Sequence, residues 1–177
     1  MGKKKQQTNT LGGQLCPMCR KKTLTLSETK MEMPYFGNVF IFSMTCSSCK
    51  YRKSDVEAEE KKEPCKYTFE VKDKKDLNVR VVKSAEATLK IPHIGVMEPG
   101  PASEGFISNV EAVILKFKSQ IEHLRDNEED ASAKKKAKNM LKKLQKVLWG
   151  SEKIKIIIED PTGNSAIISD KAQRKKL

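Results

Sequence analysis

Two short stretches, Cys16-Pro17-Met18-Cys19 and Cys46-Ser47-Ser48-Cys49, carry four of the five cysteines in this chain of 177 residues. Each CxxC pair is typical of a tight turn that points two thiolates at one position, and two such turns supply the four ligands of a tetrahedral zinc ion. A thioredoxin-like redox pair would need a βαβ setting, which the surrounding sequence lacks. The spacing therefore predicts one zinc ion, with these ligands: Cys16, Cys19, Cys46 and Cys49.

Four thiolates close the coordination sphere of zinc and leave no position for water or substrate. We therefore expect a structural zinc ion and not a catalytic one. The fifth cysteine, Cys65, has no partner at metal-binding spacing. It is interpreted as a small buried residue at the start of a strand.

The segment between the two cysteine pairs has the pattern of two strands. Residues 23–35 alternate apolar and polar side chains, and residues 39–46 are rich in branched and aromatic ones. Two strands that carry two cysteine turns describe a zinc ribbon, which we place at residues 14–56. The aromatic residues of this region lie on or near these strands, and most of them are expected to be core residues: Tyr35, Phe36, Phe40 and Phe42.

After Cys65 the sequence reads as a succession of short strands with charged turns. The expected strands fall within residues 65–73, 77–84, 86–100, 153–160 and 166–170. Asp160-Pro161-Thr162-Gly163-Asn164 has the composition of a tight turn, in which the Asp160 side chain caps the turn and Gly163 is free to take a positive φ. These segments predict an antiparallel β-domain at residues 57–172.

A helical period interrupts the strands. Apolar residues follow one helix face at Val110, Val113, Ile114, Phe117, Ile121 and Leu124. Ser108 and Glu111 match a capping box, which predicts a helix from Ser108 to about Arg125. A second helix is predicted from Ala133 to Trp149, with lysines opposite its apolar side and Gly150 at its end. The fold class is thus mainly β with α: an N-terminal zinc ribbon, then an antiparallel β-domain that carries an inserted antiparallel helical hairpin at about residues 108–149.

The charge of the chain is strongly positive, at +12. Such a balance fits nucleic acid or an acidic protein partner. Residues 1–13 and 173–177 are interpreted as flexible basic tails. No apolar run is long enough to span a bilayer, and no secretory signal is visible. We therefore expect no membrane partner. We also expect a cytoplasmic protein, because the cytosol keeps thiols reduced and paired cysteines there are available to bind a metal ion.

No catalytic residues are identified, and we expect that the protein is not an enzyme. The sequence has no P-loop motif, and its two histidines, His93 and His123, have no nucleophile at a recognisable spacing. Glu159 and Asp160 are adjacent, so in a strand they point to opposite faces and cannot share a substrate.

Several motifs together resemble the ZPR family of zinc-finger proteins. They are the double CxxC, LNVRVVKSAEATLKIP (77–92), EGFISNVEAVI (104–114) and EDPTGNSAII (159–168). The resemblance covers roughly residues 14–170, and this chain has one module, as the short archaeal members do. It implies a zinc finger followed by a β-rich domain with a helical hairpin. It also implies a partner, since the eukaryotic members bind translation elongation factor 1-alpha, preferentially with GDP, and assist its folding.

Two hypotheses about function follow. The first is a zinc-binding protein-interaction module that binds translation elongation factor 1-alpha and assists its folding or maturation, with a contact surface that the sequence does not identify. The alternative is a basic zinc-ribbon protein that binds RNA or the ribosome through its lysines.

Overall fold

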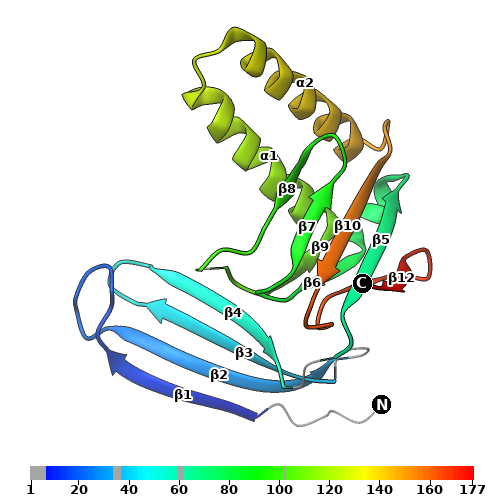
Figure 1. Ribbon diagram of the computed structural model, residues 1–177. Helices are drawn as coiled ribbons and strands as arrows, with labels where there is room; N and C mark the ends of the chain where they lie inside the picture. The colour runs from blue at the N-terminus through cyan, green and yellow to red at the C-terminus, as the bar shows by residue number, and fades with distance from the viewer. Residues whose placement is uncertain (1–6, 34–36, 60–61, 102) are drawn as a thin grey trace.

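The computed structural model describes residues 7–33, 37–59, 62–101 and 103–177. Two units follow each other along the chain: a ribbon domain, residues 7–58, and a β-domain, residues 65–177, which includes the helical hairpin. The ribbon domain lies at one end of the molecule and the hairpin at the other, with the larger sheet between them (Figure 1). Among the described residues, no helix combines the length and the apolar character that crossing a membrane requires.

The ribbon domain is an antiparallel meander of four strands. They are β1 (Gln7–Gln14), β2 (Leu24–Met33), β3 (Gly37–Cys46) and β4 (Arg52–Ala58), in that spatial order. Strands β2 and β3 are the two expected from the sequence. The prediction of a flexible tail at residues 1–13 is wrong for residues 7–13, because they belong to β1 and pair with β2. Residues 1–6 lie outside the described residues.

The aromatic residues of the ribbon domain are less buried than predicted. Phe40 and Phe42 are half-buried, and their rings stack with centroids 6.3 Å apart. Tyr35 and Phe36 lie outside the described residues. The expectation of core positions is therefore wrong for Phe40 and Phe42, because the sheet face on which they lie is only partly covered.

The β-domain contains eight strands and a short 3₁₀ helix. These elements are β5 (Cys65–Val71), η1 (Lys74–Asn78), β6 (Arg80–Lys83), β7 (Thr88–Ile91), β8 (Gly95–Met97), β9 (Phe106–Asn109), β10 (Ile154–Asp160), β11 (Ala166–Ile168) and β12 (Gln173–Lys176). They form a five-stranded sheet in the order β12-β5-β10-β7-β8 and a three-stranded sheet in the order β11-β6-β9. All of the observed pairings are antiparallel, as predicted. Residues 173–176 are not a free tail, because β12 pairs with β5.

The hairpin consists of α1 (Val110–Asn127) and α2 (Ala131–Leu148), and it is inserted between β9 and β10 as predicted. The predicted helix start at Ser108 is wrong. Ser108 belongs to β9, opposite Val81, and Asn109 is the N-cap, whose side chain accepts a hydrogen bond from the N–H of Ala112 at 2.9 Å. Asn caps a helix as well as Ser does, so the strand pairing of Ser108 decides the boundary.

The second helix begins and ends with ordinary capping interactions. Its N-cap is Asp130, whose carboxylate accepts hydrogen bonds from the N–H groups of Ser132 and Ala133. Gly150 follows the helix with a φ of +76°, in the left-handed region that favours glycine. The helix therefore stops where the sequence predicted, and it starts two residues before Ala133.

The main core lies between the hairpin and the five-stranded sheet. The sheet contributes Phe69, Leu89, Ile91, Ile156 and Ile158, and the helices contribute Val113, Ile114, Phe117, Ile121, Leu141, Leu144 and Val147. Leu124 was expected on the buried stripe of α1, but its side chain is 67% exposed. It lies near the end of the helix, past Ile121, the last buried residue of α1.

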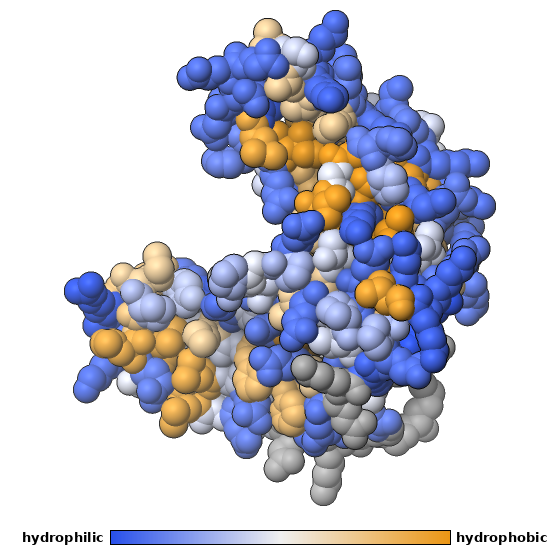
Figure 2. Space-filling view, viewed as in Figure 1, coloured by the Kyte–Doolittle hydropathy of each residue, from blue (hydrophilic) through white to orange (hydrophobic). Residues whose placement is uncertain are grey.

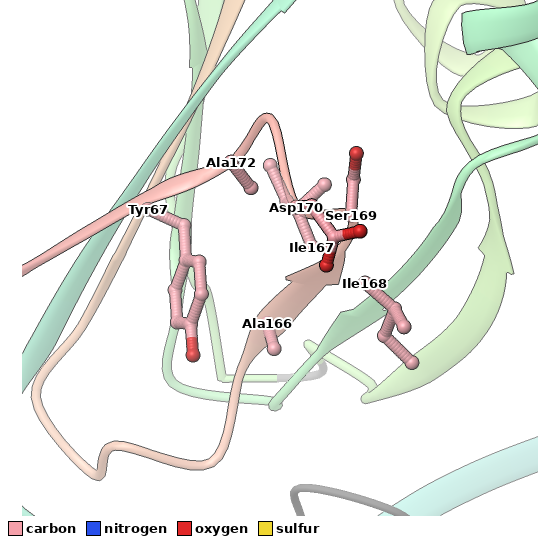
Figure 3. A pocket seen from close by; sticks show the side chains of 7 residues that line it. All are labelled: Tyr67, Ala166, Ile167, Ile168, Ser169, Asp170 and Ala172. Carbon is pink, nitrogen blue, oxygen red and sulfur yellow. The ribbon is translucent and has the colours of Figure 1, made fainter.

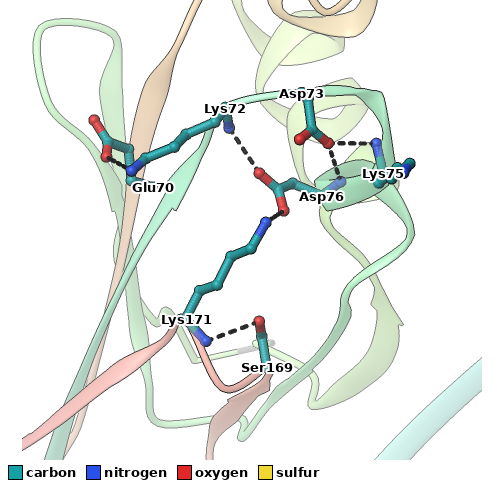
Figure 4. A network of polar contacts seen from close by, with 7 residues as sticks. All are labelled: Glu70, Lys72, Asp73, Lys75, Asp76, Ser169 and Lys171. Atoms are coloured by element: carbon teal, nitrogen blue, oxygen red, sulfur yellow. Dashed lines mark hydrogen bonds and ion pairs between the residues drawn. The ribbon is translucent and has the colours of Figure 1, made fainter.

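A buried carboxylate fixes the C-terminal segment to the rest of the β-domain (Figure 4). Asp76 accepts hydrogen bonds from Lys171 Nζ at 2.8 Å and from the N–H of Lys72 at 2.9 Å. Burial raises the pKa of Asp76, but these hydrogen bonds outweigh burial and hold the pKa below its ordinary value. The segment that leads into β12 is thereby attached to η1.

The two domains meet at strand β4. Asp55 Oδ1 accepts a hydrogen bond of 2.7 Å from the N–H of Gly105, and Lys53 forms an ion pair of 3.0 Å with Glu104. A small apolar cluster continues this contact, with Val39 from the ribbon domain and Val82 and Ala166 from the β-domain. The joint is therefore a packed contact as well as a covalent linker.

Candidate metal centre

The four predicted ligands come together at one point. The Sγ atoms of Cys16 and Cys49 lie 3.6 Å apart, and those of Cys19 and Cys46 lie 3.7 Å apart. All four sulfur atoms lie within 4.8 Å of one another. A zinc–sulfur distance of about 2.3 Å in a tetrahedron gives a sulfur–sulfur distance of about 3.8 Å, so the four thiols fit a zinc ion.

The two cysteine turns have the same backbone geometry. The N–H of Arg20 donates to the carbonyl of Cys16, and the N–H of Lys50 donates to that of Cys46, at 2.9 and 3.1 Å. The residue after each second cysteine has a left-handed backbone, with φ of 56° at Arg20 and 62° at Lys50. These repeated features explain how both turns point two sulfur atoms to one side, as the sequence predicted.

Two groups outside the ligand set contact the sulfur of Cys46. The hydroxyl of Thr23 lies 3.2 Å from this sulfur, and the N–H of Cys49 donates to it at 3.5 Å. The N–H of Cys49 and then the hydroxyl of Thr23 lower the pKa of Cys46 to about 6. Thr23 was not identified from the sequence, because CxxC spacing says nothing of the residue that precedes the neighbouring strand, β2.

The thiols of Cys19 and Cys49 show why the cluster needs a cation. The N–H of Lys21 is the main cause of a lowered pKa at Cys19. At Cys49 the N–H of Tyr51 lowers the pKa, but desolvation and the three neighbouring thiols outweigh it and raise the pKa to about 12. Without a metal ion, four negative sulfur atoms this close would repel one another, so binding of a dication is coupled to loss of the last protons.

The fifth cysteine is separate from this cluster, as predicted. Cys65 is 1% exposed at the start of β5, and its Sγ lies 3.7 Å from the carbonyl oxygen of Ser165. Burial raises the pKa of its thiol. Cys65 therefore belongs to the β-domain core and does not join the metal site.

The Asp160 turn is a buried polar cluster and not an open site. Oδ1 of Asp160 accepts hydrogen bonds of 2.7 Å from both the N–H and the hydroxyl of Thr162, and Oδ2 accepts one of 2.5 Å from the hydroxyl of Ser165. Burial raises the pKa of Asp160, but these hydrogen bonds outweigh it and hold the pKa below the ordinary value. Glu159 faces the other side, where it pairs with Lys66 and Lys90. The expected cap by Asp160 and the opposite orientation of the two carboxylates are confirmed.

The other candidate groups do not converge. His93 and His123 are both exposed, the first in a loop with a φ of +64° and the second on α1.

A hollow of about 380 Å³ lies between Tyr67 on β5 and the segment from Ala166 to Ala172 (Figure 3). Its polar side chains are Tyr67, Ser169 and Asp170. The absence of enzyme activity stays a prediction.

The fold and the four-thiol site define a class of protein: a zinc-finger ribbon joined to an antiparallel β-domain with a helical hairpin. Comparison with protein families gives two matches, the ZPR1 zinc-finger domain at residues 13–64 and the ZPR1 jelly-roll domain at residues 75–177. The chain belongs to the ZPR1 family. The resemblance noted from the sequence motifs is confirmed.

Archaeal relatives match most of the chain. An uncharacterized ZPR1-like protein of Methanocaldococcus jannaschii is 38% identical over 92% of this chain and 83% of its own length. A similar protein of Pyrococcus horikoshii is 39% identical over 92% of this chain and 75% of its own length. The zinc finger chaperone zpr1 of Schizosaccharomyces pombe is 30% identical over 86% of this chain, but the match covers 34% of that protein. This chain therefore corresponds to about a third of the fission yeast relative.

Proposed function

We propose that this chain is a protein-interaction module, stabilised by one structural zinc ion, that binds translation elongation factor 1-alpha and assists its folding or maturation. Family membership supports this proposal, because the family resemblance implies that partner and a similar fission yeast protein is named a chaperone. Any nucleotide chemistry then belongs to the partner. A cytoplasmic location is part of the proposal, because the four cysteines must stay reduced in order to bind zinc and the cytosol keeps thiols reduced.

The observation that carries the proposal is an apolar groove on the ribbon domain. The groove has a volume of about 430 Å³, and its apolar lining consists of Leu11, Leu26, Phe42 and Met44. Leu11 is 57% exposed, and two more apolar side chains near the cysteine turn, Leu15 and Met18, are 61% and 69% exposed. Figure 2 shows hydrophobic groups on the ribbon end of the molecule, and others below the hairpin, on a surface that is largely hydrophilic.

Strand register explains why these side chains form one surface. Leu11 lies opposite Leu26, and Leu26 lies opposite Met44, so the three side chains form a row across β1, β2 and β3. Phe42 is two residues from Met44 on β3 and therefore points to the same face. A solvated face of an antiparallel sheet normally presents polar side chains. An apolar row at these outward positions is typical of a surface that contacts another protein.

The zinc site supports this groove. Strand β3 ends at Cys46, and Leu26 and Met44 pack against the cluster of Cys16, Leu24 and Cys46, of which Leu24 and Cys46 lie next to them on the same face of β2 and β3. Bound zinc therefore fixes the ends of the strands that carry the groove. This arrangement gives the metal a role in binding a partner without any role in chemistry.

The test is equilibrium binding of the zinc-loaded chain to elongation factor 1-alpha from the same source, with GDP, with a GTP analogue and without nucleotide. Structured RNA is present as a competitor. We expect binding that depends on the nucleotide and persists in the presence of RNA. Absence of binding in all three nucleotide conditions, or complete loss of binding to the RNA competitor, would contradict the proposal.

A pair of variants tests the surface. Leu11→Ser combined with Met44→Ser should weaken binding at least tenfold, because the row of apolar side chains is interrupted at two strands. Leu124→Ser is the control, since Leu124 is also an exposed leucine but lies on α1 at the other end of the molecule. Zinc content measured for each variant shows that the ribbon domain is intact. Equal binding by both variants would place the contact elsewhere.

A further inference from the structure

Helix α2 concentrates positive charge on the hairpin. It carries seven lysines and no acidic residue between Ala131 and Leu148. Its neighbour α1 carries three basic and three acidic side chains, so its charge is balanced. The apolar side of α2 is buried against α1 and the sheet, at Leu141, Leu144 and Val147. The lysines are therefore available only on the outer side of the hairpin.

Four of these lysines form one line along the helix. Lys135, Lys138, Lys142 and Lys146 are separated by three, four and four residues, which is helical spacing. All four are exposed, and Leu144, which is fully buried, lies on the opposite side of the helix. In the part of the chain that the structure describes, only Lys146 of the four has an acidic partner, Glu152 at 4.0 Å. We call these four residues the lysine stripe.

The one tryptophan of the chain continues the stripe. Trp149 follows Lys146 by three residues, and it caps α2 in a helical conformation, with its N–H donating to the carbonyl of Gln145. Its side chain is 64% exposed. Tryptophan is highly buried on average, so an exposed indole in line with four cations needs an explanation beyond packing.

We propose that the lysine stripe and Trp149 bind single-stranded nucleic acid, with phosphates along the lysines and one base stacked on the indole. Proteins that bind single strands combine a cationic track with aromatic platforms, and this surface offers both over about 21 Å of helix. An acidic protein segment would pair with the lysines but would leave the indole face without a partner. A membrane surface needs an apolar helix face to insert, and that face of α2 is already buried.

This activity is independent of the proposed function. The lysine stripe lies on the hairpin, whereas the apolar groove lies on the ribbon domain at the opposite end of the molecule (Figure 1). One surface can therefore fail its test without affecting the other.

The emission of Trp149 provides a direct test, because no other tryptophan contributes to it. The zinc-loaded chain is titrated with unstructured oligouridylate and oligodeoxyuridylate, which differ only in the sugar, of about 12 nucleotides, within the range of single-strand site sizes. We expect quenching of the emission by stacking, and the tighter of the two oligomers identifies the preferred sugar. A duplex of the same length and polyglutamate are the comparison ligands. Quenching by polyglutamate, equally tight binding of the duplex, or no quenching by either oligomer would overturn the proposal.

Charge variants separate a specific surface from a general effect of net charge. The quadruple variant K135Q/K138Q/K142Q/K146Q should weaken binding at least tenfold and reduce the slope of log K against log salt by about 3, since each phosphate contact on a single strand contributes about 0.7. Gln and Lys have similar helix propensities, so α2 should persist. The matched control is K21Q/K22Q/K50Q/R52Q, which removes the same charge from exposed positions at the ribbon end. An equal loss in both variants would overturn the proposal.

Substitution of the tryptophan tests the stacking. Trp149→Ala should weaken binding about tenfold, measured with a labelled oligomer, and Trp149→Phe should restore part of the affinity because phenylalanine also stacks on bases. Circular dichroism checks that the helices are retained. Unchanged affinity in Trp149→Ala would exclude stacking and thereby the proposal.

Discussion

The carboxylate of Asp55 and the backbone N–H of Gly105 join the two domains through a hydrogen bond of 2.7 Å. The contact is close, because a Cβ atom on Gly105 would lie 2.3 Å from the carbonyl oxygen of Val56. Residue 105 must therefore lack a side chain for β4 and the start of β9 to meet.

Gly105→Ala is expected to separate the ribbon domain from the β-domain. The added methyl group collides with a backbone atom, which cannot move without shifting β4, so a loss of about 1–3 kcal/mol in the free energy of unfolding is expected. Urea unfolding of the zinc-loaded chain measures this loss. Gly100→Ala is the control, since a Cβ there meets nothing within 4 Å. If the two variants are equally stable, the joint tolerates more movement than its geometry implies.

Cys46→Ser should lose the metal ion and loosen the ribbon domain while the β-domain stays folded. Its sulfur is one of four that fit a tetrahedral site, and three thiolates bind zinc far less tightly than four in a closed site. Elemental analysis should find one zinc ion per chain in the parent protein and none in the variant. Cys65→Ala should keep its zinc. A Cys46→Ser protein that retains one zinc ion would refute the ligand assignment.

Asp160→Asn should remove an acid-sensitive contribution to stability. The folded-state pKa of Asp160 is below its unfolded value, so its stabilisation is present above the unfolded pKa of 3.8 and is lost as pH falls through the lower folded-state pKa. At neutral pH we expect the substitution to cost about 2 kcal/mol, because the amide cannot accept all of the hydrogen bonds. Unfolding measured from pH 7 to pH 3 should show a smaller loss in the variant than in the parent. Parallel curves would mean that Asp160 does not contribute to the pH dependence.

Gly163→Ala should destabilise the protein more than Gly13→Ala. Both glycines have a positive φ, of 69° and 73°. A Cβ on Gly163 would also lie 2.3 Å from the carbonyl oxygen of Glu63, whereas a Cβ on Gly13 meets nothing within 4 Å. The difference in thermal unfolding between the two variants therefore measures the steric part alone, which we expect to exceed about 1 kcal/mol. A difference of zero would show that residues 62–63 can move away.

The parts of the fold that were predicted correctly are those in which local chemistry determines structure. The CxxC spacing identified all four metal ligands, because tetrahedral zinc needs paired thiolates on turns. The apolar stripes located both helices, and Gly150 marked the end of the second. The Asp160 turn was recognised because its residues satisfy their own backbone groups.

The errors lie where pairing partners are distant in the sequence. Strand β12, with the sequence QRKK, has exposed side chains throughout and is held by its backbone pairing with β5. Such a strand has no apolar alternation to reveal it. The groove was missed for the opposite reason, since Phe42 in β3 was interpreted with its aromatic neighbours as a core residue. Only the strand register shows which side chains of β2 and β3 share one exposed face of the sheet.

The position of β10 determines when the molecule can become complete as it is synthesised. The ribbon sheet pairs only consecutive strands, so it can close and take up metal as soon as β4 has left the ribosome. In the five-stranded sheet, by contrast, β10 lies between β5 and β7. Both of these strands come before the helical hairpin in the sequence, whereas β10 comes after it. Until β10 emerges, β5 and β7 each have an open edge, and the sheet that the apolar side of the hairpin covers lacks its central strand. A nascent chain arrested before Ile154 should therefore hold a finished metal-binding domain beside an unfinished one.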